Sequence, residues 1–153
     1  MPSHNATVRW SSDNPEEFAR GRYSRAHEWA FDGGQVVRGS SSPSVVREPL
    51  SDAFGVDPEE ALVASVASCH MLWFLDLARR AGHVPTSYED EADGTLTRCD
   101  DGKVRITTIT LRPAIAWAGE APVAAAIADL HHQAHDLCFI ANSITAAVVV
   151  EAR

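Results

Sequence analysis

Residues 57–82 constrain the fold most, because they carry the features of one long helix. Asp57 is a residue type that caps a helix N-terminus, and Pro58 suits the first helical position. Arg79 is typical of a helix C-terminus, and Gly82 of the residue that ends it. At about 1.5 Å per residue, the predicted helix is about 36 Å long, enough to cross a whole small domain.

The interior of this helix is apolar and carries one chemically special residue. Residues 61–77 are apolar on nearly every side, which predicts a helix buried in the protein rather than laid on its surface. The apolar run 61–75 is interrupted by polar residues and is predicted to be too short to cross a bilayer. Cys69 lies in the middle of the helix with His70 beside it.

Composition predicts a soluble, acidic, single-domain protein. A length of 153 residues suits one domain, 1–153, with a substantial core. A net charge of -8 without a basic cluster argues against nucleic acid as a partner. The N-terminus lacks the features of a secretory signal, and the three cysteines do not form a secreted disulfide framework. We therefore expect a cytoplasmic protein without a membrane or nucleic-acid partner.

The rest of the chain predicts strands around two helices. Extended segments are predicted at residues 6–10, 20–31, 35–38, 87–97, 104–117 and 144–150. Turns and loops are predicted at residues 11–19, 32–34, 40–56 and 99–102. A second helix is predicted at 122–136, and Pro113 indicates a sheet edge or a bulge within its strand. Because no regular βαβ alternation is present, the predicted class is α+β.

Two of the cysteines are candidates for redox chemistry. Cys69 and Cys138 both lie on or next to predicted helices that a compact α+β fold would pack together. A thiolate that attacks a peroxide becomes a sulfenic acid, which condenses with a second thiol to a disulfide. The alternative is that both are small buried apolar residues. Cys99 lies in a turn with acidic neighbours that disfavour a thiolate, so we expect it to be a bystander.

A metal site is the second interpretation of these residues. His132, His135 and Cys138 follow one another at three-residue intervals, and Cys69 or His70 could complete a tetrahedral site. Neither a CxxC pair nor an HExxH motif supports zinc, which favours ordinary exposed histidines. We predict neither a metal nor a cofactor.

The two cysteine motifs resemble those of a known family. Asp57 to Leu62, followed by small residues up to Cys69, is similar to the central helix motif of the OsmC/Ohr thiol-dependent peroxidases. Cys138 and the residues around it resemble the second-cysteine motif of this family, and the similarity runs from about Tyr23 to the C-terminus. The resemblance implies an OsmC-like α+β fold, with a long central helix and a second helix packed with antiparallel-rich sheets. It also implies an intertwined homodimer with active sites at the subunit interface.

The resemblance further implies reduction of organic hydroperoxides by a dithiol or lipoyl-type reductant, in defence against oxidative stress. Cys69 would attack the peroxide and Cys138 would resolve the intermediate. Glu59 matches the glutamate of the family, and Arg25 is preferred over Arg47 as its arginine. Phe139 stands where a proline usually follows the second cysteine. A non-catalytic OsmC-like binding module that has lost turnover is the alternative.

Apolar residues near the cysteines suit an organic substrate. The aromatic and thioether side chains beside the two cysteines could line an apolar pocket. They are Met71, Trp73, Phe74 and Phe139. Plain core packing is the alternative for residues at this helical spacing.

Overall fold

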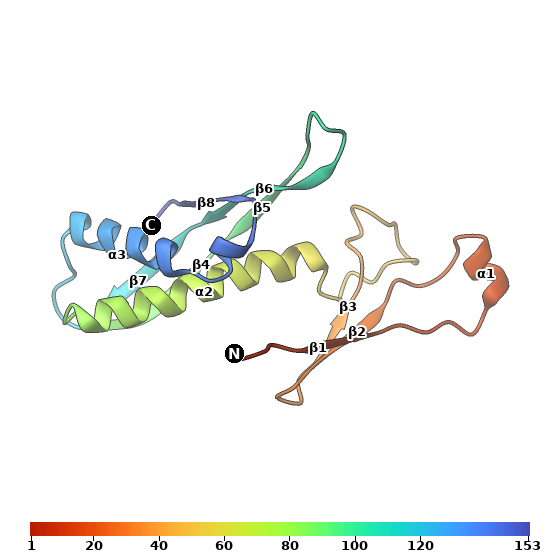
Figure 1. Cartoon of the computed structure of the whole chain (residues 1–153), viewed down its shortest axis with the longest axis horizontal. Helices are drawn as coiled ribbons and strands as arrows, with labels where there is room; N and C mark the ends of the chain where they lie inside the picture. The colour runs from red at the N-terminus through yellow and green to blue at the C-terminus, as the bar shows by residue number, and fades with distance from the viewer. The chain divides into compact units, whose positions relative to one another are not determined.

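The computed structural model describes all 153 residues, which divide into two compact units, Met1–Ala61 and Leu62–Arg153 (Figure 1). Three helices and several open sheets confirm the predicted α+β class. The single domain expected from chain length stays a prediction.

The N-terminal unit is built on a three-stranded antiparallel meander. Its strands are β1 (Ala6–Arg9), β2 (His27–Phe31) and β3 (Val36–Gly39), in the spatial order β1-β2-β3. Between β2 and β3, the Phe31 N–H donates to the Gln35 carbonyl over 2.9 Å, and Gly34 has a φ of 82°. Glycine suits this left-handed conformation, so the turn predicted at residues 32–34 is confirmed.

Residues 11–19, which we predicted to be turn-like, contain a short helix instead. This helix, α1 (Pro15–Ala19), begins after Asn14, whose side-chain oxygen accepts the Glu17 N–H over 3.0 Å. An asparagine cap followed by proline is a helix-start pattern, so the sequence did contain the information.

The long central helix is confirmed as α2 (Pro58–Arg80). Asp57 caps it by accepting the Glu60 N–H over 2.8 Å, while the Glu60 carboxylate accepts the Asp57 N–H over 3.1 Å. This reciprocal capping box satisfies two N–H groups at the start of the helix. At its other end, Arg79 and Arg80 form ion pairs with Asp76 at 2.8 and 2.6 Å.

The expectation that α2 is buried all round is wrong for the single chain. Its buried residues recur every four positions and so form one stripe. They are Val66, His70, Phe74 and Ala78. Leu72, on another side, is 61% exposed, because α3 and the sheets of the C-terminal unit cover only part of the helix.

By length and composition, α2 would be able to cross a membrane, which corrects our expectation that its apolar run is too short. The core helices of soluble proteins meet the same criteria. The observation therefore does not indicate a membrane protein.

The C-terminal unit contains two further sheets and the second predicted helix. The two-stranded antiparallel sheet pairs β4 (Pro85–Asp90) with β7 (Pro113–Trp117). In the three-stranded sheet, β6 (Val104–Leu111) lies between antiparallel β5 (Asp93–Arg98) and parallel β8 (Ala147–Val150). The remaining helices are α3 (Ala124–Leu137) and a short 3-10 helix, η1 (Ala141–Ser143).

Two segments that we predicted as single strands are each divided between these sheets. Residues 87–97 contain the end of β4 and most of β5, and residues 104–117 contain β6 and β7. The division of the second segment falls at Arg112, directly before Pro113. The chain therefore passes from one sheet to the other where a proline removes a strand N–H donor.

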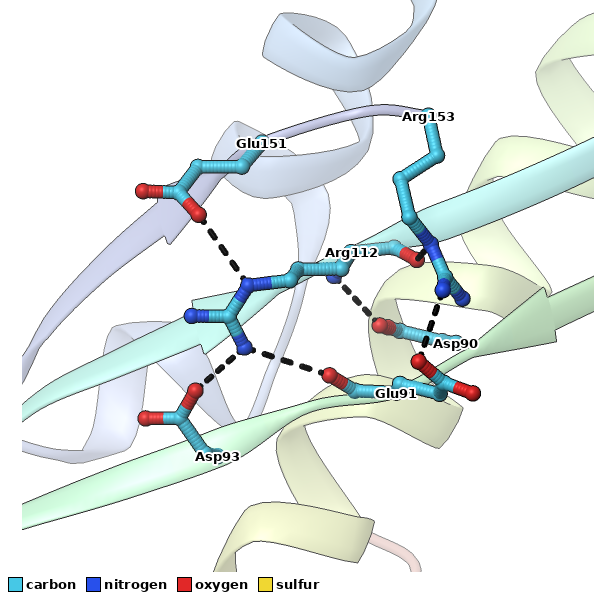
Figure 2. A network of polar contacts seen from close by, with 6 residues as sticks. All are labelled: Asp90, Glu91, Asp93, Arg112, Glu151 and Arg153. Atoms are coloured by element: carbon cyan, nitrogen blue, oxygen red, sulfur yellow. Dashed lines mark hydrogen bonds and ion pairs between the residues drawn. The ribbon is translucent and has the colours of Figure 1, made fainter.

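A polar network around Arg112 holds this crossing point (Figure 2). The backbone N–H of Arg112 donates to the Asp90 side chain over 2.6 Å, and its guanidinium forms ion pairs with Asp93 and Glu151. Arg153 donates to the Arg112 carbonyl over 3.0 Å and forms an ion pair with Glu91 at 2.6 Å. The network thus joins the ends of β4, β5, β6 and β8.

Two apolar clusters form the core of the C-terminal unit. One lies between α2 and α3, which run side by side (Figure 1), and contains Phe74, Ala78, Leu130 and Ala134. The other packs the earlier part of α2 against β6 and contains Val66, Ile109 and Leu111. The first cluster fixes α3 along α2 and thereby determines which residues of the two helices meet.

Candidate active site

The packing of α3 along α2 brings Cys69 and Cys138 together. Cys69 lies in the middle of α2 and is partly exposed, whereas Cys138 ends α3 and is fully buried. The two thiols are in hydrogen-bonding contact, and all three cysteines of the chain are free. The structure thus places the two thiols next to each other.

The environment of Cys138 favours its neutral thiol. Burial raises the pKa of the Cys138 thiol most, and the neighbouring Cys69 raises it further. The Ala141 N–H, which donates to the Cys138 sulfur over 3.3 Å, acts in the opposite direction and is outweighed. Because the thiolate is the nucleophilic form, Cys138 is poorly suited to attack a peroxide first. It is better suited to react second.

Cys99 lies in the turn between β5 and β6, as the sequence indicated. The turn is closed by its own backbone: the Cys99 N–H donates to the Lys103 carbonyl over 2.8 Å. The Cys99 thiol lies 3.8 Å from the Thr97 carbonyl. No arginine or lysine pairs with this sulfur to favour a thiolate.

Arg25 and Glu59 line one pocket within the N-terminal unit. The pocket has a volume of about 550 Å³. The Arg25 guanidinium lies 3.8 Å from the centre of the Tyr23 ring and donates to the Gly21 carbonyl over 3.2 Å. Arg25 forms no ion pair with a carboxylate, so its charge is not neutralised by a partner. Arg47, the alternative arginine, does not line this pocket.

Aromatic side chains form one wall of the same pocket, which the sequence analysis did not foresee. Trp10 and Phe18 lie 5.6 Å apart by ring centroids, Trp10 and Tyr23 5.5 Å, and Phe18 and Tyr23 4.7 Å. Trp10 directly follows β1, Phe18 lies in α1, and Tyr23 lies in the loop after α1. Their meeting depends on the short helix α1, which the sequence analysis missed.

A buried pair of histidines lies between α2 and α3. His70 Nε2 and His131 Nδ1 are 3.0 Å apart, and the two rings are nearly parallel, with centroids 5.3 Å apart, so they meet edge to edge. His70 is 0% exposed and His131 is 4% exposed. Burial lowers the pKa of each to about 4, and His131 and His135 lower that of His70 further. Both are therefore neutral at physiological pH.

The remaining histidines do not assemble the metal site that we considered. No group of three or more histidine, cysteine or acidic side chains is placed to hold an ion. His132 is exposed and lies 3.6 Å from Asp136. Of the three residues at this spacing, His132 is exposed, His135 is half-buried and Cys138 is buried.

The apolar residues near the cysteines divide between core and surface. Phe74 is fully buried and stacks on His131 at 4.3 Å, so for this residue core packing is the correct interpretation. Trp73 contacts Phe139 edge-to-face at 5.6 Å, and Phe139 is 70% exposed. Trp73 lies four residues after Cys69 on α2, and Phe139 directly follows Cys138.

The fold and the site together define the class of protein. One thiol lies on a long helix, the other lies at the end of a second helix, and open sheets complete an OsmC-like fold. Residues 51–153 match the family described as OsmC-like protein. The chain belongs to this family.

Solved structures agree with this assignment. An OsmC-like protein of unknown function from Vibrio cholerae O1 biovar eltor is 44% identical, with a TM-score of 0.96 and coverage of 100% of both chains. An organic hydroperoxide resistance protein from Elizabethkingia anophelis has a TM-score of 0.71 at 14% identity, covering 99% of this chain and 94% of that one. The organic hydroperoxide resistance protein OhrB of Bacillus subtilis has a TM-score of 0.64 at 17% identity, covering 99% and 98%.

At these low identities, the two hydroperoxide resistance proteins show the fold alone. None of the curated proteins matches the chain.

Proposed function

We propose that this protein is a thiol-dependent peroxidase that reduces organic hydroperoxides, with Cys69 as the attacking and Cys138 as the resolving cysteine. The observation that carries the proposal is the contact between the two thiols at the α2–α3 packing. The names of structural relatives, organic hydroperoxide resistance proteins, support the class of substrate.

The proposed reaction has three steps. The Cys69 thiolate attacks the terminal peroxide oxygen, the O–O bond breaks, and the organic group leaves as an alcohol after taking up a proton. The Cys138 thiol then attacks the sulfenic sulfur of Cys69, which forms the disulfide and releases water. A dithiol or lipoyl-type reductant finally attacks this disulfide and restores both thiols through a mixed disulfide.

We propose Arg25 as the source of the positive charge that the first step needs. A cation stabilises a thiolate, and the Arg25 guanidinium is held in the pocket without a carboxylate partner. A carboxylate beside a cysteine would disfavour the thiolate. We therefore propose that Glu59 acts on the arginine of its own pocket rather than on the sulfur, and that the two pair only in the assembled active site, since they form no ion pair in the single chain. The aromatic wall of the pocket suits the organic group of the substrate.

A cytoplasmic homodimer is part of this proposal. The single chain leaves Leu72 of the central helix largely exposed, although most of this helix is apolar. A second copy that covers this side of α2 would remove the apolar surface from water. We infer that two subunits pack around their central helices.

The decisive test is a steady-state assay with cumene hydroperoxide and a dithiol. The wild-type protein is expected to consume peroxide, and Cys69→Ser is expected to be inactive because serine cannot form the sulfenic acid. Cys99→Ser is the matched control and should keep full activity. Wild-type consumption no faster than that of Cys69→Ser would reject the enzyme and leave the non-catalytic binding module.

The oxidised state provides a second prediction. One equivalent of hydroperoxide should join Cys69 to Cys138 within a chain and leave Cys99 as a free thiol, because the first two are in contact. Peptide mapping under non-reducing conditions measures this directly. If a disulfide to Cys99 dominates, the wrong resolving thiol has been assigned.

A further inference from the structure

The His70–His131 pair lies between α2 and α3, close to both the apolar cluster and the two thiols. Along α2, His70 follows Cys69 directly, and Phe74 and Ala78 of the apolar cluster come next. Along α3, His131 lies within the stretch that supplies this cluster and precedes Cys138 by two helical turns. The bond between the imidazoles is therefore the polar link between α2 and α3 on the stretch that leads to the thiols.

The geometry of the pair allows little freedom. Two neutral imidazoles can form one hydrogen bond only if one nitrogen donates and the other accepts. The 3.0 Å contact, the 12° angle between the rings and the stacking of Phe74 on His131 fix both rings. His70 Nδ1 and His131 Nε2 are already buried without a partner, so a shift of one helix along the other would break this bond and leave all four ring nitrogens unpaired, which is unfavourable.

We propose that His70 and His131 are positioning residues that hold Cys69 opposite Cys138 for disulfide closure. Because His70 is next to Cys69 on α2, the bond fixes the position of the Cys69 thiol along the axis of α3. The Cys138 thiol lies at the end of this helix. The inference rests on the proposed function for its role in turnover. The step that it serves is the condensation of the Cys69 sulfenic acid with the Cys138 thiol, with loss of water.

The test separates attack from closure by rapid kinetics with a stoichiometric amount of hydroperoxide. In His131→Leu, sulfenic acid formation should keep its rate, while disulfide closure should slow on the order of tenfold or more, since small misplacements of reacting atoms are costly. His131→Asn, whose amide places a polar atom near the position of Nδ1, should recover most of the closure rate. A structural role alone would not separate the two steps or respond to this rescue.

Two further variants guard against a loss of folding. His70→Leu/His131→Leu removes both polar groups together and leaves no buried atom unpaired, so it should fold while closure stays slow. Leu130→Val loosens the neighbouring apolar cluster without touching the bond, and should close at the wild-type rate. Equal closure in the double variant and the wild type, or equal slowing in Leu130→Val, would overturn the proposal.

A measurement without peroxide separates this inference from the proposed function. At equilibrium with reduced and oxidised glutathione, the constant for forming the Cys69–Cys138 disulfide should fall about tenfold in His131→Leu, which equals about 30 mV. This result would stand even if the protein reduced no hydroperoxide. An unchanged constant together with unchanged closure would show that the histidines do not position the thiols.

Discussion

Mixing Cys69→Ser with Glu59→Gln, each impaired by itself, is expected to restore peroxidase activity to about a quarter of the wild-type level. Random exchange of subunits makes half of the dimers mixed. If each site takes its cysteine from one chain and its glutamate from the other, a mixed dimer has one intact site and one doubly altered site. Activity then rises above that of either variant alone.

The reason to expect sites completed in trans is the geometry of α2. Glu59 and Cys69 are ten residues apart, which on a straight helix separates them by about 15 Å along the axis and about 80° around it. A glutamate side chain cannot cover this distance. The simplest arrangement brings Glu59 from the partner's central helix, packed antiparallel across a two-fold axis.

Glu60 offers the matched control for this experiment. It lies about 180° around the helix from Cys69, and its carboxylate accepts the Asp57 N–H in the capping box. Glu60→Gln should therefore lower stability by about 1 kcal/mol or less while folded dimers stay active. If mixed dimers of the first two variants recover no activity although subunit exchange is demonstrated, Glu59 acts within its own chain or has no role.

The sequence predicts α2 well because everything that defines this helix is local. The cap of Asp57, the basic last turn and the apolar interior all lie within the segment itself, and the structure confirms the bounds to within two residues. Two expectations were wrong: Leu72 is exposed, and the helix is long and apolar enough to cross a membrane by length and composition. How much of an apolar helix is buried depends on which elements pack against it, and the sequence of the helix itself does not determine this.

The strands show the opposite case, because their limits are set by distant partners. Residues 104–117 form a continuous β-favouring run, yet β6 pairs with β5 and β8 whereas β7 pairs with β4. Contacts of Arg112 with residues up to 41 positions away hold the change of sheet. Pro113 indicated an irregularity, but no local pattern could assign the two halves to different sheets.

The candidate site was predictable in its chemistry and not in its surroundings. Motif resemblance selected Cys69 and Cys138, and the structure brings them into contact, while their roles stay predictions. The bond between His70 and His131 joins residues 61 positions apart, and no local sequence pattern around either residue predicts it. An isolated histidine in an apolar helix is a weak pattern until its partner is known.

Acidification from pH 6.5 to pH 4 should lower the free energy of unfolding by about 3 kcal/mol or more through the buried histidine pair. Burial lowers the pKa of His70 and of His131 from 6.5 to about 4. Between these pH values the histidines bind protons in the unfolded chain but stay neutral in the folded one. Stability is therefore complete above pH 6.5 and is lost as the pH falls towards 4. Urea unfolding across this range measures the loss.

Two variants test whether the buried histidine pair causes this loss of stability. His70→Leu/His131→Leu removes both titrating groups and should flatten the curve between pH 6.5 and pH 4, because no buried imidazole is left to charge. His132→Gln alters an exposed histidine of α3 and should leave the curve unchanged. The pKa values of Asp76 and Asp101 are lowered from 3.8 by their arginine partners, so most of the stability that these carboxylates contribute is lost below pH 4, outside this window. A double variant that loses as much stability as the wild type would show that other groups titrate, and that the buried pair is not the acid-sensitive element of the fold.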